Sequence, residues 1–148
     1  MPLALAASLI FAAAAVFYSF SLRREVANLQ TVVRVIQSPD LLNVVVKGQD
    51  VASSASGRAL WSRSSGLVFS AQRLPMLPAG RVYQLWTITG KTATSAGLMT
   101  PDANGAAFVA ISVAPDAARP DAFGVTIEPA GGSASPTMPI VMLGASGQ

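Results

Sequence analysis

The sequence predicts an all-β domain, an antiparallel β-sandwich or barrel, preceded by one N-terminal helix. From Leu41 onward, short runs rich in Val, Ile, Thr and aromatic residues alternate with clusters of Gly, Pro, Asn and Ser, which is typical of strands joined by tight turns. No run of 10–12 residues after Ile36 keeps a helical period without a helix breaker. Ahead of this region, residues 3–22 carry no charged side chain. We therefore expect a helix over the first part of the chain and one β-domain over residues 41–148.

The first expected element is a transmembrane helix over residues 1–22. The uncharged run from Leu3 to Leu22 matches the roughly 20 apolar residues that a helix needs to span a bilayer. A cleaved signal peptide is the alternative, but it has a charged region before a shorter apolar core and a small-residue cleavage site after it. Here no Lys or Arg precedes the run. Bulky residues crowd its end, namely Phe17, Tyr18, Phe20 and Leu22.

A helical stalk with a linker is expected over residues 23–40. Apolar residues recur there at spacings of 3 and 4, which places them on one helical face: Val26, Leu29, Val33 and Ile36. We favour packing of this stripe against its own domain or the membrane surface over a short coiled coil with a second copy. Self-association of the chain stays open. Pro39 ends the helix, because proline disfavours helix at its own position and before it.

The β-domain is expected to contain a series of short strands. The strand over 81–89 is apolar on both faces, which suits a central strand, so its Trp86 is interpreted as core rather than as a ligand platform. Asn104-Gly105 is a strong hairpin signal, because both residues tolerate positive φ. The expected strands are 41–47, 50–53, 58–62, 66–71, 81–89, 95–100, 105–113, 122–128 and 139–143.

Composition excludes several chemistries. The chain has no Cys and no His, which removes disulfides, thiol nucleophiles, imidazole bases and the usual zinc ligands. We therefore expect no catalytic residue, no cofactor and no metal. The net charge is +3, but the 10 basic residues are scattered, which does not indicate nucleic-acid binding. They are interpreted as surface charge, with Arg23 and Arg24 contacting membrane lipid headgroups.

One acidic residue stands at a conspicuous place. Glu128 closes a β-branched strand just before the Gly-rich turn of residues 130–133. An enzyme would pair it with a second carboxylate, such as Asp121 or Asp102. We favour a structural role, in which the carboxylate accepts backbone N–H bonds from the following turn. The segment from Pro129 to Pro139 is then an ordered loop.

Two motifs point to a known family. The segment VTIEPAGGSASPTMP spans residues 125–139, and RVYQLWTITGK spans 81–91, followed by SAGLM at 95–99. Together they resemble the extracytoplasmic C-terminal domain of anti-sigma-K factors, the RskA family, over residues 1–144. Twelve residues carry the family motifs and are expected to be structural: Tyr83, Gln84, Leu85, Trp86, Gly97, Thr126, Glu128, Pro129, Gly131, Gly132, Pro136 and Thr137.

The resemblance implies a function in transcription regulation. It implies a membrane-anchored anti-sigma factor that regulates an extracytoplasmic-function sigma factor. This sequence would supply the transmembrane helix and the outer sensor or protease-gating domain, and envelope and intramembrane proteases would cleave it in turn. The family's cytoplasmic sigma-binding domain uses His and Cys, which are absent from this sequence. A standalone membrane-tethered β-sandwich that binds a partner in the cell envelope is the alternative.

The resemblance also implies a location. It places the chain in the bacterial plasma membrane with a single pass and the C-terminal domain outside the cytoplasm. The positive-inside rule, applied to Arg23 and Arg24 alone, gives the opposite orientation. We expect the orientation of the family.

Overall fold

The computed structural model describes the backbone of residues 2–147 and the side chains of residues 14–23 and 25–147. The chain forms two compact units, Met1–Gln30 and Thr31–Gln148. The first consists of helix alone, and the second holds the end of that helix together with all the strands.

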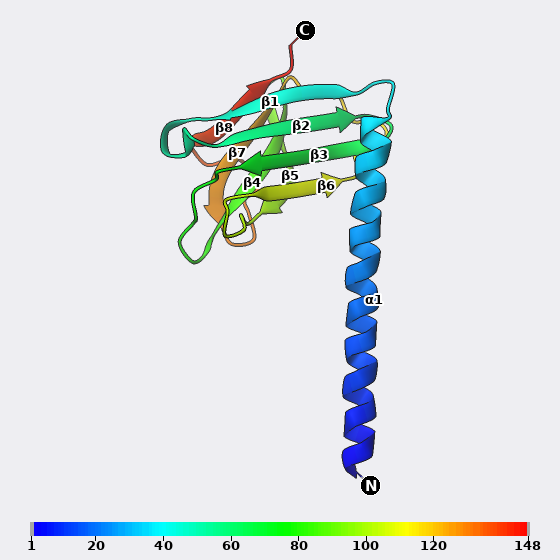
Figure 1. Ribbon diagram of the computed structural model, residues 1–148. Coiled ribbons are helices and arrows are strands. Elements are labelled where there is room, and N and C mark those ends of the chain that lie inside the picture. Colours follow the sequence, from blue (N-terminus) through cyan, green and yellow to red (C-terminus); the bar gives the residue numbers. More distant parts are fainter. Residues whose placement is uncertain (1, 148) are drawn as a thin grey trace. The chain divides into compact units, whose positions relative to one another are not determined.

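One uninterrupted helix, α1, runs from Pro2 to Ile36, so the expected first helix and stalk form a single element (Figure 1). Within the described part of the chain, no helix combines the length and the apolar character that a membrane crossing requires. The expected membrane span over residues 1–22 stays a prediction. Part of that span, the side chains of residues 3–13, lies outside the described residues.

The helix turns a different face to the β-domain from the one expected. Val33 and Ile36 are 52% and 53% exposed, whereas Val35 is fully buried and Thr31 nearly so. Successive helical residues turn by about 100°, so Val35 lies on the side opposite Val33. Val33 and Ile36 therefore do not pack against the β-domain, and packing of the stripe against the membrane surface stays a prediction. The strands meet the helix at Thr31, whose Cγ2 lies 3.5 Å from where a Cβ on Gly66 would stand.

The β-domain contains eight strands in the described residues, and β4 has the bounds that the sequence predicts. The expected strand over 50–53 is wrong: Asp50–Ala52 forms a 3₁₀ turn, η1, with Asp50 at a φ of 43°. The strands are β1 (Leu42–Gly48), β2 (Ser56–Ser62), β3 (Gly66–Gln72), β4 (Arg81–Thr89), β5 (Thr92–Met99), β6 (Ala107–Ile111), β7 (Ala122–Pro129) and β8 (Ile140–Ala145).

These strands form one antiparallel sheet in the order β5-β4-β7-β8-β1-β2-β3-β6. The sheet folds over, so that β1, β2, β3 and β6 lie in front of β4, β5 and β7 in Figure 1. Its two edge strands, β5 and β6, also approach each other. A Cβ atom added to Gly97 in β5 would lie 3.0 Å from Cγ1 of Val109 in β6. The predicted antiparallel β fold is confirmed, in the form of a sheet that nearly closes into a barrel.

The core lies between the two layers. Strand β4 pairs with β5 on one side and with β7 on the other. Its Tyr83 and Leu85 are fully buried, and Trp86 is 1% exposed. Since β4 has a paired strand on each side and its motif residues are buried, it places the aromatic residues of the motif strand inside the domain. The next strand, β7, carries Glu128 just before its last residue, Pro129.

Candidate functional site

Glu128 is a fully buried carboxylate near the end of β7, opposite Val82 of β4. A buried carboxylate is stable only when its oxygens are hydrogen-bonded. Here Oε1 accepts bonds from Oγ1 of Thr126 at 2.5 Å and from the backbone N–H of Thr137 at 2.8 Å. Its Oε2 accepts bonds from Oγ of Ser133 at 2.7 Å and from Oγ1 of Thr137 at 2.8 Å. Both oxygens therefore have two neutral donors each.

The donors of Glu128 come partly from the expected turn and partly from beyond it. The sequence predicted backbone N–H donors from residues 130–133. That turn supplies a hydroxyl instead, from Ser133, and the backbone donor is Thr137. Thr126 can donate because residues two apart in a strand face the same side. The loop therefore closes over the carboxylate at two places along its length.

Gln84 in β4 anchors the same loop to the sheet. Its Oε1 accepts from the backbone N–H of Ser133 at 2.8 Å, and its Nε2 donates to the carbonyl of Ser133 at 3.1 Å. Nε2 also donates to Oγ of Ser95 at 2.7 Å. Gly132 has a φ of 81°, and a Cβ there would lie 2.8 Å from Oε1 of Gln84. Only glycine fits this close crossing.

Trp86 completes the arrangement by donating from Nε1 to Oγ1 of Thr126 at 2.8 Å. The Glu128 network is thus built from β4, β7 and the loop between β7 and β8. Its members are Gln84, Trp86, Thr126, Glu128, Ser133 and Thr137. Ser133 is the member that the motif residues did not include.

The other motif residues lie outside this network. Tyr83 is buried and donates its hydroxyl proton to the carbonyl of Pro75 at 2.9 Å. Leu85 pairs with Gly97 next to a β-bulge. The remaining three residues of the motif belong to the end of β7 and the loop after it: Pro129, Gly131 and Pro136.

The environment keeps Glu128 ionised. Burial raises the pKa of Glu128, but the hydrogen bonds from Thr126, Ser133 and Thr137 outweigh burial and lower the pKa to about 2. A carboxylate with so low a pKa and with both oxygens occupied is a poor proton acceptor at neutral pH. The arrangement suits a structural anion that holds the loop on the sheet.

The acids that an enzyme could pair with Glu128 each cap a turn of their own. Asp121 accepts the backbone N–H of Gly90 at 2.6 Å. Asp102 accepts the N–H groups of Asn104 and Ala106 at 2.8 and 2.9 Å. Among the described residues, no group of three or more acidic side chains could hold a metal ion.

A second polar cluster joins the end of α1 to the turn between β2 and β3. Oδ1 of Asp40 accepts from Oγ of Ser62 at 2.7 Å, and Oδ2 accepts from the backbone N–H of Arg63 at 3.0 Å. The hydroxyl groups of Ser38 and Ser65 form a hydrogen bond at 2.5 Å. We call Ser38, Asp40, Ser62, Ser64, Ser65 and the backbone N–H of Arg63 the junction cluster.

The hydrogen bond from Ser62 lowers the pKa of Asp40, although burial acts in the opposite direction. Sequence reasoning missed this cluster, because Ser-rich turns and an Asp after a proline are common in surface loops. The pairing of Asp40 with the turn at 62–65 depends on a contact between distant parts of the sequence. The one local signal for the cluster was the turn at 62–65, which contains three serines.

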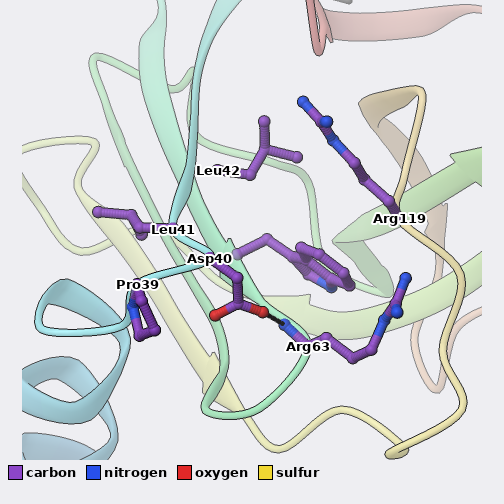
Figure 2. Close-up of a pocket in the computed structure, with 7 residues that line it drawn as sticks. Pro39, Asp40, Leu41, Leu42, Arg63 and Arg119 are labelled. Carbon is purple, nitrogen blue, oxygen red and sulfur yellow. Dashed lines mark hydrogen bonds between the residues drawn. The ribbon is translucent and has the colours of Figure 1, made fainter.

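A pocket of about 370 Å³ adjoins the junction cluster (Figure 2). Arg63 enters it from the turn between β2 and β3, and Arg119 enters from the loop between β6 and β7. The sequence interpretation treated both arginines as scattered surface charge. The lining residues are Pro39, Asp40, Leu41, Leu42, Trp61, Arg63 and Arg119.

Comparison with known proteins gives one family match and two relatives. The model of the family described as "Anti-sigma-K factor rskA, C-terminal" matches residues 3–140. An uncharacterized protein encoded in the phr 5' region of Streptomyces griseus is 37% identical over 111 residues. Anti-sigma-K factor RskA of Mycolicibacterium vanbaalenii is 31% identical over 112 residues. Each alignment covers 74% of this chain but 44% of the relative, so the chain spans less than half of each relative's length. No solved structure gives a significant match.

Proposed function

This chain belongs to the family of anti-sigma-K factor C-terminal domains, and from that premise we propose that it is the outer regulatory part of a membrane-anchored anti-sigma factor. The family is regulatory rather than enzymatic. The sigma factor would be bound by a cytoplasmic domain outside this sequence. The present chain would control when that domain is released from the membrane. The effect of this chain on transcription would therefore be indirect.

The proposed anchor is the uncharged run from Leu3 to Leu22, with the β-domain outside the cytoplasm in the bacterial plasma membrane. The length of the run and its lack of charge support this assignment, as does the family. Release would follow two cuts. An envelope protease would first remove the β-domain, and an intramembrane protease would then cut within Leu3 to Leu22.

One observation carries the gating part of the proposal. Helix α1 enters the β-domain with Val35 fully buried, and the next residues are tied to the β2–β3 turn through Ser38 and Asp40. Proteases cut exposed chain that can open locally, and opening is rare where side chains and backbone are hydrogen-bonded to a folded core. While the β-domain is folded, the junction at 37–41 is therefore a poor substrate.

The experiment compares the lifetime of the anchor with and without the β-domain. An N-terminal epitope tag is followed by blot after synthesis is stopped, in cells that carry an intramembrane protease and in matched cells that lack it. The full chain should persist in both strains. A chain truncated after Gln37 should disappear quickly in the first strain and persist in the second. If the truncated and full chains are equally long-lived in the first strain, gating fails and a tethered binding module becomes the better account.

A further inference from the structure

The pocket beside the junction cluster has two guanidinium groups on its border. Arg63 and Arg119 are both exposed, and they come from different loops (Figure 2). Nε of Arg63 donates to the carbonyl of Ala117 at 3.1 Å. Nη2 of Arg119 donates to the carbonyl of Gly147 at 3.4 Å. Each guanidinium has five N–H donors, so these bonds position the side chains and leave most donors available.

The acid in the pocket, Asp40, is hydrogen-bonded to the junction cluster. The carboxylate of Asp40 accepts from the hydroxyls of Ser62 and Ser64 and from the backbone N–H of Arg63. Both of its oxygens are therefore occupied by the junction cluster. Its negative charge still faces the pocket, so a bound anion must place its charge beside the guanidinium groups and away from Asp40.

The rest of the lining is apolar. Leu42 and Trp61 border the pocket, together with Pro39 and Leu41. A volume of about 370 Å³ is near the lower end of the range for small-molecule sites. Apolar walls with a few charged groups are typical of such sites. Guanidinium groups prefer planar carboxylates and phosphates, which accept two parallel N–H bonds.

We propose that this pocket binds a small molecule that carries a carboxylate or phosphate group on a flat apolar body. Arg119 binds the oxyanion, Arg63 adds positive charge at the pocket border, and Leu42 and Trp61 contact the apolar part. The site does not depend on the proposed gating function, and binding can be measured whether or not the β-domain controls proteolysis. The oxyanion could belong to a soluble molecule or to a phospholipid headgroup, and the experiment separates the two.

The test uses the full chain in a neutral detergent with ¹⁵N-labelled tryptophan. The two tryptophans give two indole N–H signals: Trp61 borders the pocket, and Trp86 is buried in the Glu128 network. Substitution of Trp61 by Phe assigns the signals. Phenyl phosphate and benzoate are added at constant ionic strength, with benzylamine as a cation of similar shape. A saturable shift of the Trp61 signal alone, with either anion and not with benzylamine, is expected.

Two arginine variants test whether Arg119 binds the anion. Arg119→Gln should weaken binding about tenfold, the loss expected for one charge-assisted hydrogen bond, whereas Arg81→Gln, an exposed arginine of β4 away from the pocket, should bind normally. An unmoved Trp86 signal shows that each variant is folded.

The lipid source is tested with bicelles that contain phosphatidylglycerol. They should not shift the Trp61 signal if the ligand is soluble. A shift with bicelles and none with phenyl phosphate assigns the oxyanion to lipid. Equal shifts of both tryptophans, a shift that does not saturate, or unchanged binding in Arg119→Gln would overturn the proposal.

Discussion

Thr126 and Glu128 share one face of β7, and Oγ1 of Thr126 donates its proton to Oε1 of Glu128 across 2.5 Å. The Thr126 proton points toward Glu128 because Oγ1 of Thr126 also accepts a hydrogen bond from the indole N–H of Trp86, at 2.8 Å. A hydroxyl that accepts one bond in a buried site is left to donate along another direction. Trp86 of β4 therefore fixes the direction of the hydrogen bond from Thr126 to the buried carboxylate.

Replacing Glu128 by Gln should destabilise the β-domain by on the order of 1–3 kcal/mol, because a buried, hydrogen-bonded charge is lost and an amide N–H₂ faces hydroxyl and amide donors. Urea unfolding of the full chain at pH 7 measures the effect. Asp116→Asn, which changes the charge equally at an exposed loop residue, is the control and should be neutral. If Glu128→Gln instead abolishes a hydrolytic activity while unfolding is unchanged, the structural interpretation of Glu128 is wrong.

Acid should unfold the domain partly through Glu128. Its pKa falls from an ordinary value of 4.5 to about 2 in the folded chain. A lowered folded-state pKa gives stability that is complete above the unfolded value and is lost as pH falls through the folded value. The contribution, on the order of 3 kcal/mol, should disappear between about pH 4.5 and pH 2. Unfolding free energies at several pH values should therefore converge for wild type and Glu128→Gln at low pH; a constant difference between them would contradict this assignment.

The fold could be predicted from local patterns, and the sites only in part. Strand β4 was predicted to the residue because its two apolar faces and its turns are local signals. The stripe at Val33 and Ile36 was expected to meet the domain or the membrane surface, and it does not meet the domain. Periodicity predicts a helix but does not show which side contacts the sheet, and that side is formed by Val35 and Thr31. The prediction of a structural role for Glu128 came from its place before a Gly-rich turn. Its donor Thr137 and the partners of Asp40 depend on tertiary contacts that no local pattern encodes.

The junction cluster should control access to residues 37–41. Asp40→Asn weakens the bonds to Ser62 and to the backbone of Arg63, so a non-specific protease should cut the junction faster in purified full chain. Edman sequencing or mass spectrometry locates the cut. Asp116→Asn should leave the rate unchanged. If Asp40→Asn and wild type are cut at the junction at the same rate, the junction cluster does not protect residues 37–41.

The proposed topology places residues 38–148 outside the cytoplasm. Protease added to intact spheroplasts should therefore digest the β-domain and leave an N-terminally tagged anchor fragment. A cytoplasmic marker protein must stay intact in the same sample. Digestion of the β-domain only after lysis would show that the orientation is reversed. That is the orientation that the positive-inside rule gives for Arg23 and Arg24.

The gating claim is tested most directly by the lifetime of the tagged anchor in cells when the β-domain is destabilised but still present. The measurement compares wild type, Glu128→Gln and Asp116→Asn in cells with both proteases. The account predicts a shorter lifetime for Glu128→Gln alone, and no difference among the three when the intramembrane protease is deleted. A lifetime for Glu128→Gln equal to that of wild type, in a chain that urea unfolding shows to be less stable, would contradict it.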